Sequence, residues 1–344
     1  ESVAGKLRNS TKLQWTGYSN DCELFSMRMA EVAGVELMGD ILSAPPLTYY
    51  RDAVEAGLRF VEAGLPVYIG GGCLYGATGP ATLAGSTVTN NAELMGPLVL
   101  FQLVNPGARV FVGDFTFPQN MRTGSLLFGA IGSDLHQVVF NQIWRRYGVP
   151  TLNAAEYTSS KSIDFQAGYE RAMASLTSAL SGCNMICLHG GLFGEITFHP
   201  LAAILDDDIA GMIGRFLEGV KVDHETIALD LIDEVGPVPG EYLSTEHTRK
   251  WWKKEQFIPK AADRLTYPEW LKEGKKAALD YAKERMEEIL ATHEVSVPLT
   301  EEQEQAIEDI LKEAREYYRE RGLISDEEWE VYRKQIESPD YPYA

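Results

Sequence analysis

Short apolar runs alternate with longer amphipathic stretches over the first two thirds of this chain. The runs have the length of buried strands and are bounded by turn residues, whereas the stretches carry apolar residues at helical spacing. The pattern predicts six strands, at residues 12–17, 38–44, 66–70, 108–113, 149–154 and 184–191. Each predicted strand leads into a predicted helix, at residues 22–34, 49–64, 82–105, 133–148, 166–182 and 200–219.

A strand–helix repeat of this kind predicts parallel strands joined by right-handed crossovers. A glycine-rich loop follows the strand at 66–70, at the end where α/β folds place their chemistry. It contains no G-x-x-x-x-G-K-[ST] pattern and no suitable G-x-G-x-x-G, which disfavours phosphate binding. Six units fit either an open doubly wound sheet or an incomplete barrel. We favour an α/β fold of the (β/α)8 TIM type over residues 1–220, with two N-terminal units missing from this chain.

The pattern changes after residue 220. Residues 222–236 predict one more helix, closed by Gly236, and residues 240–259 are predicted to be irregular, aromatic and charged. Capping-box spacings then open two exposed helices, at Thr300 with Gln303 and at Ser325 with Glu328. We therefore expect residues 221–344 to form a mainly helical extension that packs on the barrel. Bracing or homo-oligomerisation is its expected role.

The formal net charge of −19 argues against nucleic-acid partners and anionic membrane surfaces, because both require a basic face. No apolar run reaches the length that would span a bilayer. The cysteines are Cys22, Cys73, Cys183 and Cys187, and their spacing does not suggest a disulfide framework. We therefore expect a cytoplasmic protein in a reducing compartment.

Several separate blocks resemble the trimethylamine methyltransferase superfamily, in the family's order. They are KLRNSTKLQWTGYS, the long block GATGPATLAG to ARVFVGDF, MRTGSLLFGAIGSD, YTSSKSIDFQAGYE and the run from GVKVDHETIALD to TRKWW. The resemblance implies a barrel that starts upstream of Glu1. It also implies methyl transfer from an amine to the Co(I) of a corrinoid (cobalamin-type cofactor) carried by a partner protein. The trimethylamine branch contains pyrrolysine, which this sequence lacks, so the chain resembles the quaternary amine branch, typified by glycine betaine methyltransferases.

Quaternary ammonium suits such a reaction because its leaving group is a neutral amine, so no general acid is needed. The cobalt of the partner would be the nucleophile, and no catalytic residue is expected in this chain. Such a cation has no N–H group and is recognised by aromatic faces and nearby negative charge. Candidates in the loops after successive strands are Tyr75, Phe115, Tyr157, Phe193 and Glu156. Donors for a betaine carboxylate are expected at His189, Asn20, Asn153 and Gly190.

Four alternatives remain open. Each aromatic residue can serve packing alone. A zinc site is a second alternative, with Cys183, Cys187, His189 and Cys73 as ligands. Alternate residues of a strand stand about 7 Å apart, however, which gives poor tetrahedral geometry. The substrate can also be carnitine, proline betaine or another methylated amine, or the chain can be a non-catalytic betaine-binding subunit.

An Asp-x-His-x-x-Gly corrinoid signature is absent, since Asp134 and His136 are followed by valine at position 139.

Overall fold

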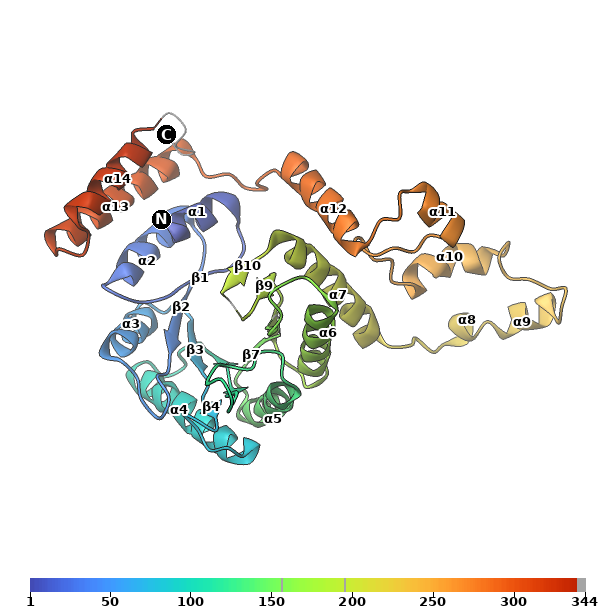
Figure 1. Cartoon of the computed structure of the whole chain (residues 1–344), viewed down its shortest axis with the longest axis horizontal. Coiled ribbons are helices and arrows are strands. Elements are labelled where there is room, and N and C mark those ends of the chain that lie inside the picture. The colour runs from blue at the N-terminus through green and yellow to red at the C-terminus, as the bar shows by residue number, and fades with distance from the viewer. Residues whose placement is uncertain (156, 195, 339–344) are drawn as a thin grey trace. The chain divides into compact units, whose positions relative to one another are not determined.

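The computed structural model (Figure 1) describes residues 1–155, 157–194 and 196–338. The chain divides into two compact units. The first comprises Glu1–Gly70, Ala92–Phe111 and the residues from Glu294 onward, and the second comprises Gly71–Asn91 and Val112–His293. The two units therefore alternate along the sequence, with Ala92–Phe111 of the first lying between the two segments of the second.

Six strands form the main sheet, and their spatial order follows the chain: β1-β2-β3-β5-β7-β8. The pairs β1–β2, β2–β3, β5–β7 and β7–β8 are all parallel. A doubly wound sheet would reverse its strand order at a switch point, so this monotonic order favours part of a barrel. The predicted α/β fold is confirmed. The strands are β1 (Gln14–Thr16), β2 (Leu37–Leu42), β3 (Val67–Gly71), β5 (Val110–Asp114), β7 (Thr151–Ala154) and β8 (Met185–Cys187).

The first unit is closed by helices from both ends of the chain. Its core joins Leu7, Phe25 and Met29 to Ile307 and Leu311, although these residues lie far apart in sequence. Burial of such apolar surface is the main stabilising contribution. The helices of this unit are α1 (Ser2–Asn9), α2 (Cys22–Ala33), α3 (Arg51–Glu62), the C-terminal part of α4 (Leu83–Val104), α13 (Glu301–Glu320) and α14 (Asp326–Ile336).

The second unit places α5 beside α6 and α6 beside α7, and α12 also packs against α7. Its long helices are α5 (Ile131–Tyr147), α6 (Phe165–Leu180), α7 (Pro200–Glu218) and α12 (Ala278–Thr292). A series of shorter helices lies between α7 and α12 (Figure 1): α8 (His224–Ile227), α9 (Leu229–Val235), α10 (Glu246–Glu255) and α11 (Tyr267–Lys272). Two small strand pairs complete the unit, β4 (Leu74–Tyr75) with β6 (Phe117–Pro118) and β9 (Gly191–Leu192) with β10 (Thr197–Phe198).

Two local predictions are wrong. The single helix expected over 222–236 is interrupted at Ala228, whose φ of 53° is left-handed and ends α8 before α9 begins. The stretch 240–259, expected to be irregular, contains α10, which Thr245 caps by accepting a hydrogen bond from the Thr248 N–H. Both predicted capping boxes, at Thr300 and Ser325, are confirmed. Among the described residues, no helix is long and apolar enough to cross a membrane.

Candidate functional site

Five aromatic side chains gather in the second unit, on strand β6 and in the loops after β6, β5, β7 and β8; we call them the aromatic cluster. The Phe117 and Tyr157 ring centroids lie 5.2 Å apart, and Phe128 packs edge-on against both. Phe115 approaches Tyr157 at 6.1 Å, and Phe193 approaches Phe128 at 5.9 Å. Tyr157 and Phe117 are buried, whereas Phe115, Phe128 and Phe193 are half-buried. The structure therefore brings together three predicted residues, Phe115, Tyr157 and Phe193.

Backbone and carboxylate hydrogen bonds fix these loops against one another. The Glu170 carboxylate accepts from the Thr158 hydroxyl at 2.5 Å and from the Ser159 N–H at 3.1 Å. The Phe193 N–H donates to the Ser160 carbonyl at 2.9 Å. Gly194 has a left-handed φ of 68°, and a Cβ there would lie 2.5 Å from the Phe128 ring. Only glycine allows this close approach. The aromatic cluster is thus held on ordered loops.

A cation already lies on one ring of the aromatic cluster. The Lys161 ammonium is 4.2 Å from the centroid of Phe193 and donates a hydrogen bond of 2.7 Å to the Ser159 carbonyl. An ammonium within about 6 Å of a ring centroid is attracted by the negative face of the π system. Phe193 therefore presents a face that accepts positive charge.

The predicted residue Tyr75 lies near an acidic residue, Asp134 of α5. The Tyr75 hydroxyl lies at the start of α5, where a Cβ on Gly132 would be 2.3 Å from its oxygen. Burial raises the pKa of Tyr75. Burial, followed by the neighbouring Glu170 carboxylate, also raises the pKa of Asp134 to about 6. The start of α5 therefore carries a buried carboxyl group whose pKa is raised above its usual range.

Of the remaining predicted residues that the structure describes, Asn153, His189 and Gly190 belong to the second unit and Asn20 to the first. The Asn153 amide, buried on β7, donates to the Ser178 hydroxyl of α6 at 2.9 Å, so it packs on the helix side of the sheet. His189 is exposed directly after β8, and the Gly190 N–H donates to Asp206 at 2.8 Å. Asn20 is exposed in the first unit with a left-handed φ of 49°. Glu156 lies outside the described residues.

The sequence reasoning missed an aromatic row in the first unit. Trp15 of β1 stacks on Tyr68 of β3 at 5.4 Å, and Tyr68 approaches Phe111 of β5 at 6.0 Å. Asp40 on β2 pairs in register with Tyr68, so both side chains leave the same face of the sheet. The signal was present in the sequence as one bulky aromatic residue at the centre of each of three predicted strands.

A buried polar network beside β5 was also missed. The Asp114 carboxylate accepts from the Asn90 amide of α4 at 3.0 Å and lies 2.7 Å from the His136 Nδ1 of α5. Both Asp114 and His136 have fully buried side chains. Burial alone lowers the pKa of His136, but the charge and hydrogen bond of Asp114 act against it, and the net shift is upward. This network ties the sheet to two helices.

The described residues contain no group of three His, Cys, Asp or Glu side chains that could hold a metal ion. The predicted zinc alternative therefore has no described ligand set, although Cys183 and Cys187 do lie close together in sequence around β8. The Cys183 thiol instead contacts the Thr151 and Met185 carbonyls, at 3.4 and 3.0 Å. Burial raises the pKa of Cys183, which disfavours the thiolate that zinc requires.

Comparison with known proteins places the chain in a family. The family model described as trimethylamine methyltransferase (MTTB) matches residues 22–317. The chain belongs to this family. This MTTB-family chain is 36% identical over 260 residues to the glycine betaine methyltransferase of Desulfitobacterium hafniense (strain Y51), which covers 75% of the chain and 53% of that relative.

Trimethylamine methyltransferases are similar at lower identity. The trimethylamine methyltransferase MttB of Methanosarcina barkeri (strain Fusaro / DSM 804) is 31% identical over 251 residues, covering 73% of this MTTB-family chain and 50% of that protein. MttB of Desulfitobacterium hafniense (strain DSM 10664 / DCB-2) is 31% identical over 279 residues, with 81% and 56% covered. The chain therefore spans about half the length of these relatives, and the family resemblance predicted from its sequence blocks is confirmed.

Proposed function

We propose that this chain acts in the transfer of a methyl group from a quaternary amine, with glycine betaine as the preferred substrate, to the Co(I) of a corrinoid carried by a partner protein. Family membership supports the coarser reaction, a methyltransferase of the MTTB type. The finer choice of substrate is supported by the relative named glycine betaine methyltransferase, at 36% identity. The sequence of this chain contains only the standard twenty amino acids and no pyrrolysine.

The observation that carries the proposal is the ammonium of Lys161 over the face of Phe193, at the edge of the aromatic cluster. Trimethylammonium groups have no N–H and are bound by the same aromatic faces. Phe193, Phe128 and Phe115 are half-buried, whereas Tyr157 and Phe117 are buried. In this proposal the substrate cation replaces Lys161 on the Phe193 ring.

The protein's contribution would be to hold the cation, exclude water and orient one methyl group. Orientation of reacting groups is itself a large source of rate enhancement. The methyl acceptor, the corrinoid of the partner, supplies the nucleophile. His189, which is exposed after β8, is the donor to a betaine carboxylate in this proposal.

The test is methyl transfer by the full chain to cobalamin reduced to Co(I), with glycine betaine as donor. Dimethylglycine and methylated cobalamin should appear in equal amounts, and both should depend on the protein. Carnitine, proline betaine and trimethylamine form the substrate panel. Binding of betaine without transfer would favour a non-catalytic binding subunit, and transfer from trimethylamine alone would contradict the proposal.

A matched pair of variants tests the aromatic face. Phe193→Leu should weaken glycine betaine binding by about 0.5–2 kcal/mol, or roughly twofold to thirtyfold in Kd, because the π face is lost and an apolar side chain is kept. Phe165→Leu is the control, since Phe165 is highly exposed on α6, outside the aromatic cluster. Calorimetric titration measures both. Equal Kd values for the two variants would remove Phe193 from the site.

A further inference from the structure

Glu170 of α6 carries a buried negative charge that contacts the loops of the aromatic cluster. The residue is 8% exposed. Its carboxylate accepts from three neutral donors, the Thr158 hydroxyl, the Ser159 N–H at 3.1 Å and the Gln166 amide at 2.9 Å. Hydrogen-bond donors favour the ionised form of a carboxyl group. None of these three donors carries a positive charge that would balance it.

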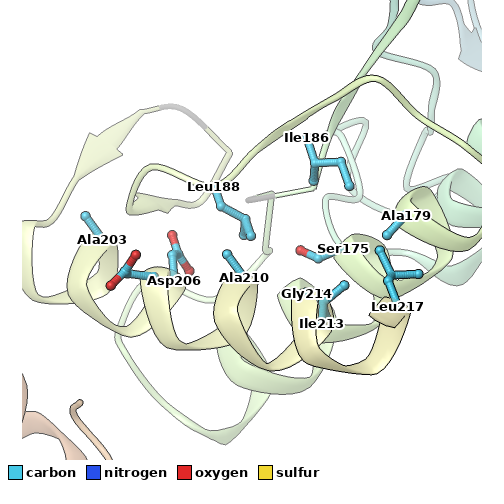
Figure 2. A pocket seen from close by; sticks show the side chains of 11 residues that line it. Ser175, Ala179, Ile186, Leu188, Ala203, Asp206, Ala210, Ile213, Gly214 and Leu217 are labelled. Atoms are coloured by element: carbon cyan, nitrogen blue, oxygen red, sulfur yellow. The ribbon is translucent and has the colours of Figure 1, made fainter. Parts of the chain in front are cut away.

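No ion pair balances Glu170 either. The neighbouring guanidinium on α6, that of Arg171, pairs with Asp206 of α7. Asp206 lines an apolar pocket of about 480 Å³ between the end of β8 and the helices α6 and α7 (Figure 2). The charge of Asp206 is therefore balanced, whereas Glu170 forms no ion pair with any described residue. A buried charge without a partner is costly, so a cation near Glu170 would be stabilised.

A second buried carboxyl group adds to this negative charge. Asp134 at the start of α5 is 5% exposed. Burial, and after it the charge of Glu170, raises the pKa of Asp134 to about 6. Each carboxyl group therefore lies in the electric field of the other. Asp164, which caps α6 by accepting from the Ala167 N–H, is exposed to solvent.

Ser159 connects Glu170 to the cation on the aromatic cluster. Its N–H donates to the Glu170 carboxylate at 3.1 Å, and its carbonyl accepts from the Lys161 ammonium at 2.7 Å. The backbone N and O atoms of one residue lie at most about 3.6 Å apart, so the two charges are within about 10 Å of each other. The same ammonium lies 4.2 Å from the Phe193 ring centroid. A cation on this ring is therefore within reach of the field of Glu170.

We propose that Glu170 makes this site specific for a cation. This assignment rests on the proposed function, in which a quaternary ammonium group replaces Lys161 on the Phe193 ring. Glu170 does not touch the ligand. Its charge favours a positive group at that position over an uncharged group of the same shape. At about 10 Å and an effective dielectric constant of about 20, this preference corresponds to roughly tenfold in Kd.

Calorimetric titration of the full chain with glycine betaine and 3,3-dimethylbutanoate tests this preference. The two ligands have the same shape and the same carboxylate, but carbon replaces the charged nitrogen in the second. The wild type should bind glycine betaine more tightly. Glu170→Gln keeps the shape of the side chain and removes its charge, so the ratio of the two Kd values should fall roughly tenfold. Glu234→Gln makes the same change at an exposed position on α9 and should leave the ratio unchanged.

The outcomes separate this assignment from the proposed function. An unchanged ratio in Glu170→Gln would overturn the role of Glu170, although the wild type could still bind betaine and transfer its methyl group. A ratio that falls in Glu170→Gln supports the role of Glu170 even if the wild type transfers no methyl group, which would contradict the proposed function alone. Equal affinity of the wild type for the two ligands would overturn both.

Lys161→Met is a second test, and it remains decisive if Glu170→Gln fails to fold, as judged by circular dichroism. The substitution removes the ammonium that lies on the Phe193 ring and keeps an apolar side chain of similar length. Glycine betaine should then bind at least threefold more tightly relative to 3,3-dimethylbutanoate, because the charge of Glu170 has lost its nearby cation. An equal change in the two Kd values would overturn the proposal, since access to the ring would then control binding.

Discussion

Replacing Asp114 by asparagine tests the network that joins β5 to α4 and α5. The substitution keeps the shape of the side chain and removes its charge. Asp114 Oδ1 accepts from the Asn90 amide at 3.0 Å and from the Thr116 N–H at 3.1 Å, and Oδ2 lies 2.7 Å from His136 Nδ1. A hydrogen bond to a charged group stabilises the fold by about 1 kcal/mol more than a neutral one. Removing the charge from three such bonds should therefore lower the free energy of unfolding by about 3 kcal/mol.

The loss should depend on pH, because Asp114 favours the protonated form of His136. The pKa of His136 is raised in the folded state, so the stabilisation from this pair is complete below the unfolded value of about 6.5. It declines as the pH rises through the folded pKa. The destabilisation caused by Asp114→Asn should therefore be larger at pH 5.5 than at pH 8.5.

Urea denaturation followed by circular dichroism at both pH values measures this difference. The control is Asp233→Asn, which removes a carboxylate from an exposed position on α9 and should change the free energy of unfolding by less than about 0.5 kcal/mol. A loss below about 0.5 kcal/mol for Asp114→Asn would refute the reasoning. A destabilisation by Asp114→Asn that grows as the pH is raised would refute it as well.

Two further substitutions should change stability. Asp134 has a pKa raised to about 6 by burial and by Glu170, so the wild type gains stability as the pH falls through 6. Asp134→Asn should therefore be more stable than wild type by about 1–3 kcal/mol at pH 8 and equal to it near pH 4. If urea denaturation gives the same difference in free energy of unfolding at both pH values, this reasoning is wrong. Gly39→Ala places a Cβ 2.4 Å from Phe60 Cδ2 and should cost about 1–3 kcal/mol in thermal unfolding. Gly17→Ala, with nothing within 4 Å, is the control, and equal melting of the two would refute the clash.

The order and type of the main elements could be predicted because strand and helix periods differ clearly. The apolar run PVYIG predicts a buried strand, and all five residues of β3 are buried. The break at Ala228 could not be predicted, since apolar residues continue at helical spacing across it, at Ile227, Leu231 and Val235. A left-handed alanine leaves no signature in composition.

The candidate site could be predicted only in part, for a similar reason. Phe115, Tyr157 and Phe193 are brought together because loops after parallel strands meet at one end of the sheet. Phe128 was missed because it lies in a loop without periodicity. Asn153 was expected among the donors, but its side chain faces α6. Successive residues of a strand face opposite sides of the sheet, so an error of one position in the predicted register reverses the side that a residue faces.

The alternation of the two units along the chain has a consequence for biosynthesis. Arg8, near the start of the chain, pairs with Glu304 at 2.8 Å, and α13 covers α2. The ribosome must therefore translate the whole second unit before the first can acquire its last helices. Residues 112–293 of the second unit therefore leave the exit tunnel while α2 is still uncovered by α13. Of the two units, the one whose described residues begin earlier in the sequence is completed later.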